Sequence, residues 1–222
     1  MVQPNDAPDL PTRVDTTIKA ALALLPYVGG ALAILYEDVL TRRRAKLEVF
    51  GKAAFERHPD GWEGFLQHLQ GDARLAELFV RAGESAQTST VRQKAAALGR
   101  LLADAATAGT EDEVDNMELL TLALIDLEWP HIRALSRLAE YPSDAEIERE
   151  PGADGKKIGE DVRRKARFAL QRALSEPALS ALVRHGLVGQ QSGYGLYVSG
   201  VTQHGRDLLG YITMSDDTPP PE

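Results

Sequence analysis

The sequence contains no cysteine. This absence excludes disulfide bonds, cysteine-ligated zinc and thiol catalysis, and it is typical of proteins of a reducing cytoplasm, where we expect this chain to work. Residues Met1–Val14 also lack a basic segment followed by an apolar one, so they do not resemble a secretory signal. With 222 residues, 43% of them hydrophobic, the chain is long enough to bury a core in one large domain or two small ones.

Long apolar runs are missing as well. The longest uncharged stretch, Ala20–Tyr36, has 17 residues and contains Pro26, Gly29 and Gly30. A membrane-spanning helix takes about 20 apolar residues without such interruptions. We therefore expect a buried helical hairpin with a hinge at Pro26, Gly29 and Gly30. A membrane-active hairpin at residues 20–36 is the alternative to core packing.

The sequence has no motif of an enzyme active site. Its five histidines lack the spacing of a helical metal site, and it contains no P-loop, no glycine-rich dinucleotide motif and no Gly-x-Ser-x-Gly turn. The acidic residues Glu146, Glu148 and Glu150 stand in polar surroundings, which is typical of a solvated face rather than of a catalytic carboxylate pair. We expect a binding protein with no catalytic residue, cofactor or metal.

Helical periodicity dominates the first 129 residues, and strand-like alternation begins only after residue 187. We therefore predict a mainly α protein in which an N-terminal helical bundle precedes a C-terminal winged helix with a two-stranded β-wing. The predicted parts are a flexible N-terminus at 1–10, the helical bundle at 11–129, the winged-helix domain at 130–213 with an acidic insertion at 142–157, and a disordered tail at 214–222.

Capping signals mark several helix starts within the bundle. One long helix is expected to end near Arg57. Asp72 is a candidate N-cap, and Thr110 with Glu113 forms a capping-box pattern. The intervening periodic stretch predicts a helix over Thr88–Ala108.

The region after residue 157 has the clearest order of elements. Ile158–Leu174 is a predicted helix, and Ser175 is a candidate cap for a short helix that ends at Gly186. A polar turn at 189–193 then separates Leu187-Val188 from an alternating strand over 194–198. Thr202 is expected to cap a last helix.

This stretch resembles the winged-helix family. The resemblance is carried by Leu182, His185, Gly186, Leu187, Val188, Thr202, Gly205, Leu208 and Leu209. It implies that the helix before the wing enters the major groove of duplex DNA while the wing touches the backbone. The long acidic insertion is the departure from the family pattern. The residues expected to contact DNA are Arg163, Arg164, Lys165, Arg167, Arg172, Ser180, Arg184, His185, Gln190, Gln191 and Tyr194.

Charge is distributed unevenly over a chain whose net charge is −8. Residues 111–154 contain 13 acidic and three basic side chains, whereas residues 156–206 contain nine basic and three acidic ones. Two interpretations stay open: the two blocks face each other within the fold, or the basic block faces a partner.

The whole chain also resembles bacterial proteins of the Abi-alpha type, which are linked to abortive infection. The resemblance is carried by Leu25–Gly30, Arg42–Arg44, Leu98–Leu102 with Ala105, and Leu127 with His131, Ile132 and Leu135. It implies a cytoplasmic bacterial protein with an anti-phage or stress role and no catalytic residue.

Two functions follow as hypotheses. In the first, the protein is a regulator that binds double-stranded DNA and uses its helical part as a sensor or dimerisation domain. In the second, it is a phage-defence interaction protein whose winged helix holds a protein partner or a homo-oligomer. The predicted recognition helix is rich in alanine and leucine and has one arginine, which keeps the second hypothesis open.

Overall fold

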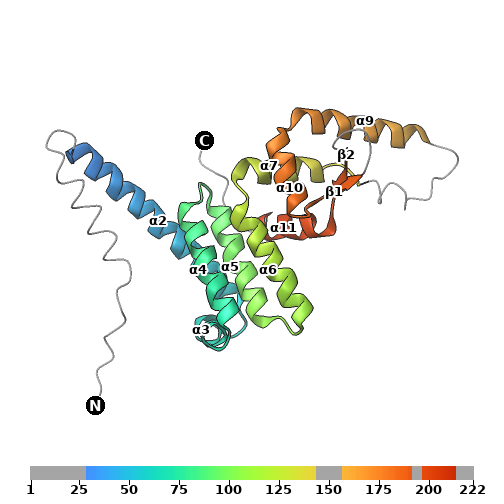
Figure 1. Ribbon diagram of the computed structural model, residues 1–222. Helices are drawn as coiled ribbons and strands as arrows, with labels where there is room; N and C mark the ends of the chain where they lie inside the picture. The colour runs from blue at the N-terminus through green and yellow to red at the C-terminus, as the bar shows by residue number, and fades with distance from the viewer. Residues whose placement is uncertain (1–28, 144–156, 192–196, 214–222) are drawn as a thin grey trace, which may run out of the picture. The chain divides into compact units, whose positions relative to one another are not determined.

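The computed structural model describes residues 29–143, 157–191 and 197–213 (Figure 1). The chain divides into two compact units, Met1–Ala45 and Lys46–Glu222, and each is described by itself. Nine helices and two strands lie in the described ranges. The prediction of a mainly α protein with a hairpin before the final helix is confirmed.

The first unit contributes the start of helix α2 (Gly29–Arg57), which continues into the second unit. Gly29 and Gly30 are the first residues of this helix, and the hinge predicted at these two glycines stays a prediction. The first amides of a helix need no partner within the helix, which makes its start a tolerant place for glycine. The third hinge residue, Pro26, lies outside the described residues. Further along α2, exposed Arg42 pairs with Asp38 one turn earlier (2.6 Å), as expected of a solvated helix face.

The second unit begins with the helical bundle. The last turns of α2 are followed by four helices: α3 (Gly61–Gly71), α4 (Ala73–Thr88), α5 (Arg92–Thr107) and α6 (Glu111–Asp126). Helix α5 packs against both α4 and α6, and most of its side chains are buried (Figure 1). Its alanines and leucines leave little polar surface to bury, which suits a helix at the centre of a core.

Two residues of α5 show how closely the core is packed. A Cβ on Gly99 would lie 2.2 Å from the carbonyl oxygen of Phe50, so only glycine lets α5 approach α2 at this point. Lys94 is 3% exposed, and its Nζ donates to the carbonyls of Ile125 (3.0 Å) and Leu127 (2.7 Å). Burial lowers the pKa of Lys94, and its ammonium satisfies carbonyls at the C-terminal end of α6.

The predicted caps within the bundle are confirmed. The side chain of Asp72 accepts from the first amides of α4, and Thr110 and Glu113 form a reciprocal capping box on α6. The helix predicted to start at Thr88 starts four residues later, at Arg92. Thr88 is the last residue of α4, and the Ser89 hydroxyl accepts from the amide of Val91 (3.1 Å), which holds the chain in a turn between the two helices.

The remaining elements follow the order of a winged helix. They are α7 (Trp129–Ala139), α9 (Lys157–Ala173), α10 (Glu176–Arg184), β1 (Val188–Gln191), β2 (Tyr197–Val201) and α11 (Gln203–Thr213). Pro130 lies in the first turn of α7 and Pro177 in the first turn of α10, as predicted. Ser175 stands at the N-cap of α10, but its side chain makes no capping hydrogen bond, so that part of the prediction is wrong.

The hairpin is shifted along the chain relative to the prediction. Strand β1 extends to Gln191, so residues 189–191 are in the strand and not in the tip. Strand β2 is described from Tyr197 onward, and the predicted strand residues 194–196 lie outside the described residues. The antiparallel register pairs Val188 with Val201 and Gln191 with Tyr197, with an irregularity after Gly189. Three valines of the two strands, Val188, Val198 and Val201, are buried, and this hydrophobic face fixes the register.

The turn from α10 into β1 depends on three of the residues that carry the winged-helix resemblance. Gly186 has φ +66°, which reverses the chain at little steric cost. The Thr202 hydroxyl donates to the Gly186 carbonyl (2.7 Å) and accepts from the amide of Gly205 (3.1 Å), so the predicted cap on α11 is confirmed. A Cβ on Gly205 would lie 2.2 Å from the carbonyl oxygen of Leu187, which explains why glycine is needed where α11 meets this turn.

Within the described ranges, no helix has the length and apolar character needed to cross a bilayer. The hydrophobic core of the second unit runs without a break from Phe50 in α2 to Ile212 in α11. The predicted domain boundary at residue 129 stays a prediction, because residues on both of its sides belong to the second unit.

Candidate nucleic-acid interface

Helix α9 presents most of the predicted cations to solvent. Arg163, Arg164, Lys165 and Arg172 are all exposed. Phe168 is 41% exposed and lies three or four residues from Arg164, Lys165 and Arg172, which are therefore its neighbours on the helix surface. We call Arg164, Lys165, Phe168 and Arg172 the α9 face. In the part of the chain that the structure describes, no acidic side chain pairs with its three cations.

Arg167 is on the opposite side of α9 and does not fit the predicted DNA contact. Its side chain is 2% exposed, and Nη1 donates to the carbonyls of Pro142 (2.9 Å) and Ser199 (3.2 Å). Beside it, the Gln171 side chain accepts from the amide of Val198 (3.3 Å). These contacts hold α9 against strand β2, so Arg167 stabilises the fold. The other predicted cations of α9 are on its outward side.

The outward side of α10 has little charge. Ser180 and Arg184 are exposed, as predicted, and the acidic Glu176 precedes Ser180 by one turn. A recognition helix that reads base edges uses several polar or cationic side chains on this face. Here the face offers one cation, one hydroxyl and one carboxylate, which provides little means of sequence-specific recognition.

His185 ends α10 and points mainly inward, which does not fit its predicted DNA contact. Its side chain is 15% exposed, and Nε2 is buried without a hydrogen-bond partner among the described residues. The nearest carboxylate, Asp126, is 3.5 Å away, which is too long for a strong hydrogen bond. Burial lowers the pKa of His185 despite the opposing effect of Asp126, so the imidazole is neutral at pH 7.

The wing contributes one described candidate side chain. Gln190 is exposed on β1. Gln191 ends the same strand, but its side chain lies outside the described residues, as does the whole of Tyr194. The predicted contact of the wing tip with DNA therefore stays a prediction.

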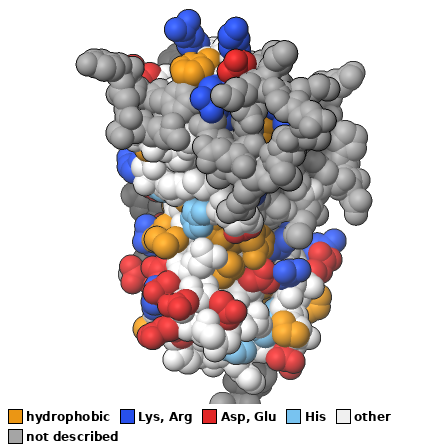
Figure 2. All heavy atoms as spheres, turned by 90° about the vertical axis from the view of Figure 1, so that its right-hand side faces the viewer, with side chains coloured by type: hydrophobic (Ala, Val, Ile, Leu, Met, Phe, Trp, Pro, Cys, Tyr) orange, Lys and Arg blue, Asp and Glu red, His pale blue; other side chains and the backbone are white. Residues whose placement is uncertain are grey.

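The acidic helix α6 lies apart from the basic helix α9. Residues 111–128 contain seven acidic side chains and no lysine or arginine. Figure 1 shows α6 and α9 in different parts of the second unit, and the two helices are not among those that pack together. In Figure 2, lysine and arginine side chains lie at the upper edge, where α9 lies, with acidic side chains beside them, and further aspartate and glutamate side chains are spread over the lower half. Intramolecular pairing with α6 therefore does not neutralise α9.

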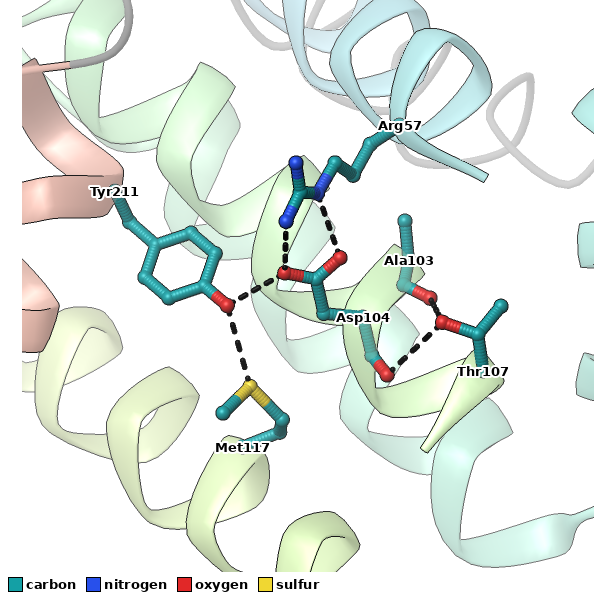
Figure 3. Close-up of polar contacts among 6 residues, drawn as sticks. All are labelled: Arg57, Ala103, Asp104, Thr107, Met117 and Tyr211. Atoms are coloured by element: carbon teal, nitrogen blue, oxygen red, sulfur yellow. Dashed lines mark hydrogen bonds and ion pairs between the residues drawn. The ribbon is translucent and has the colours of Figure 1, made fainter. Parts of the chain in front are cut away.

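A polar network links the last helix of the winged-helix module to the bundle (Figure 3). Arg57 donates to both carboxylate oxygens of Asp104 (2.7 and 3.0 Å), and the Tyr211 hydroxyl donates to the same carboxylate. Arg100 adds a bond to the Tyr211 carbonyl (2.9 Å). Burial and the hydrogen bond to Asp104 raise the pKa of Tyr211, so its phenol stays protonated at neutral pH and acts as a structural donor.

The exposure of Phe168 and the contact of Asp104 with Tyr211 were not predicted from the sequence. The exposure of Phe168 has a sequence signal, because an aromatic residue lies three or four positions from three cations. The contact of Asp104 with Tyr211 joins residues 107 positions apart and leaves no local pattern.

In the described residues, no group of three histidine or carboxylate side chains is placed to hold a metal ion. The chain matches no protein-family model, no curated protein and no solved structure.

Proposed function

We propose that the protein binds duplex DNA through its winged helix, with α9 making the main contact to the phosphates. The observation that carries this proposal is the set of exposed cations on the α9 face, Arg164, Lys165 and Arg172, none of which forms an ion pair with a described acidic side chain. Cations that replace counterions along the DNA backbone supply most of the free energy of non-specific binding.

The α10 helix and the wing have a smaller role in this proposal. Ser180 and Arg184 on α10 and Gln190 on β1 are exposed and have side chains able to hydrogen-bond to bases or sugars. Because this set is small, we expect modest discrimination between DNA sequences and an affinity that depends strongly on salt.

Fluorescence anisotropy with a labelled duplex tests the proposal. The double variant Arg164→Glu/Arg172→Glu is expected to weaken binding by about tenfold or more at low salt, because it replaces two phosphate contacts with repulsion. A matched control is Arg81→Glu/Arg92→Glu, which makes the same charge change at exposed positions of α4 and α5. Equal losses in the two variants, or no duplex binding by the wild type, would contradict the proposal.

A protein-binding winged helix is the second candidate function. The low charge on the outward side of α10 favours it, since Glu176 there repels phosphate while Ser180 and Arg184 suit a polar protein surface equally well. A role in phage defence belongs to this candidate. Native mass spectrometry of the purified protein tests it: an oligomer that persists in excess duplex DNA supports it, and a monomer that binds duplex DNA favours the first candidate.

A further inference from the structure

The surface of α6 carries an exposed leucine among carboxylates. Leu119 is 59% exposed, more than any other large hydrophobic side chain that the structure describes. Asp112, Asp115, Leu122 and Asp126 follow the same side of the helix at spacings of three and four residues. We call these five residues the α6 face.

Cations of the same chain neutralise only part of the α6 face. Arg74 binds Asp115 (2.5 Å) and also contacts Glu118, so these two carboxylates are balanced by one guanidinium. Asp126 keeps half of its side chain exposed. Its contact at 3.5 Å is with His185, which is neutral at pH 7, and its cationic neighbour Lys94 is buried beneath α6. Asp112 is exposed as well. The α6 face therefore combines negative charge with an uncovered apolar side chain.

The α9 face has the complementary character. Phe168 is its exposed apolar side chain, and Arg164, Lys165 and Arg172 surround it with positive charge. The two helices are of similar length, with 16 residues in α6 and 17 in α9. When two such helices are laid side by side in antiparallel directions, Phe168 meets Leu119 and Leu122 while the flanking charges of opposite sign come together.

We propose that the α9 face of one copy of this protein binds the α6 face of a second copy. The two faces lie in different parts of the second unit, so the contact forms between molecules. Apolar contact at the centre supplies affinity, and the charges set the register and exclude binding of like faces. Because the two surfaces differ, the contact is head-to-tail and can continue from copy to copy.

This inference goes beyond DNA binding but uses the same cations of α9. Duplex DNA and the α6 face of a second copy therefore compete, and added duplex is expected to disperse the assemblies. The part of the inference that concerns this competition rests on the proposed function, whereas self-association itself does not.

Sedimentation velocity on two complementary variants tests self-association. Arg164→Glu/Arg172→Glu reverses two charges of the α9 face, and Leu119→Ser/Asp126→Asn removes the exposed apolar side chain and one carboxylate of the α6 face; all four positions are exposed, so the fold is expected to survive. Each variant alone is expected to be monomeric. A mixture of the two is expected to form a dimer with one copy of each, because one normal α9 face and one normal α6 face remain and no further copy can add.

Controls separate a surface effect from a loss of folding. Circular dichroism should show wild-type helix content for both variants. Val80→Ser removes an apolar side chain that is 57% exposed on α4 and should leave wild-type association unchanged, whereas Leu119→Ser should weaken it by about tenfold.

The outcomes distinguish this inference from DNA binding. A monomeric wild type at low salt, or a mixture of the variants that fails to associate, overturns self-association. If the wild type binds duplex DNA, the α6 variant should bind it equally well, whereas self-association is judged from sedimentation without DNA, so the two claims fail separately. Dimers of the mixture that persist in excess duplex would overturn the competition alone.

Discussion

The hydroxyl of Tyr211, in the last helix, donates a hydrogen bond of 2.5 Å to the carboxylate of Asp104, in the last turn of α5. The same carboxylate accepts two bonds from Arg57 at the end of α2. Three helices that are distant in sequence therefore meet at one side chain, and the winged-helix elements are joined to the bundle by a polar contact as well as by the shared core.

Removing the Tyr211 hydroxyl should weaken this junction. We expect Tyr211→Phe to lower the free energy of unfolding by about 1 to 2 kcal/mol, since a half-buried hydrogen bond to a carboxylate is lost while the ring is kept. Urea denaturation measures the change. Tyr141→Phe is the matched control, because the Tyr141 hydroxyl makes no hydrogen bond to any residue that the structure describes. Equal effects of the two variants would contradict the structural role of Tyr211.

Two glycines of α11 should respond in opposite ways to alanine. We expect Gly205→Ala to destabilise the protein by about 3 kcal/mol, because its Cβ would lie 2.2 Å from the Leu187 carbonyl oxygen and 2.8 Å from a methyl group of Val201. Gly210 has nothing within 4 Å of a built Cβ, so Gly210→Ala should stabilise the helix by up to about 1 kcal/mol. Thermal denaturation compares them, and a tolerated Gly205→Ala would show that α11 does not pack as described.

Substitutions at Arg167 and Arg164 should have different effects, on the stability of the protein and on its binding of duplex DNA respectively. Arg167→Met removes a buried donor from the carbonyls of Pro142 and Ser199, and we expect it to cost about 2 to 3 kcal/mol of stability. Arg164→Met changes an exposed side chain and should alter stability by less than about 0.5 kcal/mol while weakening duplex binding. Chemical denaturation and anisotropy on both variants check the two roles, and a destabilised Arg164→Met would contradict the assignment.

Acid should destabilise the protein in part through His58. This side chain is 3% exposed, and its Nδ1 accepts from the amide of Asp60 (3.2 Å). Burial and the nearby His68 lower its pKa, against an opposing effect of Asp60. Because the folded state binds the proton less readily than the unfolded state, this contribution to stability is present above about pH 6.5 and is lost as the pH falls.

His58→Asn tests that contribution, since the amide oxygen can accept from Asp60 without titrating. The loss of stability between about pH 7 and pH 5 should be smaller in the variant than in the wild type. It should not vanish, because burial also lowers the pKa of His185 and His204. Identical pH profiles from urea denaturation would exclude a role for His58.

Local signals in the sequence predicted much of the fold. Capping at Asp72 and Thr110 depends on bonds between residues two or three positions apart, so the pattern and the bond coincide. The roles of Gly186 and Thr202 were predicted for a similar reason. The turn that they close requires a backbone conformation and a hydrogen bond that few residue types can provide. Of the five cations of α9 that were predicted to contact DNA, Arg163, Arg164, Lys165 and Arg172 are exposed, and the contact itself stays a prediction.

Features that depend on packing between distant segments were not predictable. In the sequence, Arg167 is indistinguishable from the other cations of a basic helix. Its burial follows from the positions of β2 and Pro142, which pack against it. The register of the hairpin is fixed by the buried faces of Val188, Val198 and Val201, which a single strand pattern does not reveal. The burial of the His185 side chain likewise depends on a neighbour distant in sequence, since its Nε2 lies 3.5 Å from Asp126 of α6.

The salt dependence of duplex affinity tests the proposed function most directly. If Arg164, Lys165 and Arg172 each contact a phosphate, replacing all three with glutamine should make the slope of log affinity against log salt shallower by about 2.7, or about 0.9 per contact. Anisotropy titrations between about 50 and 200 mM salt measure the slope. An unchanged slope, or no duplex binding by the wild type at the lowest salt, would contradict the account.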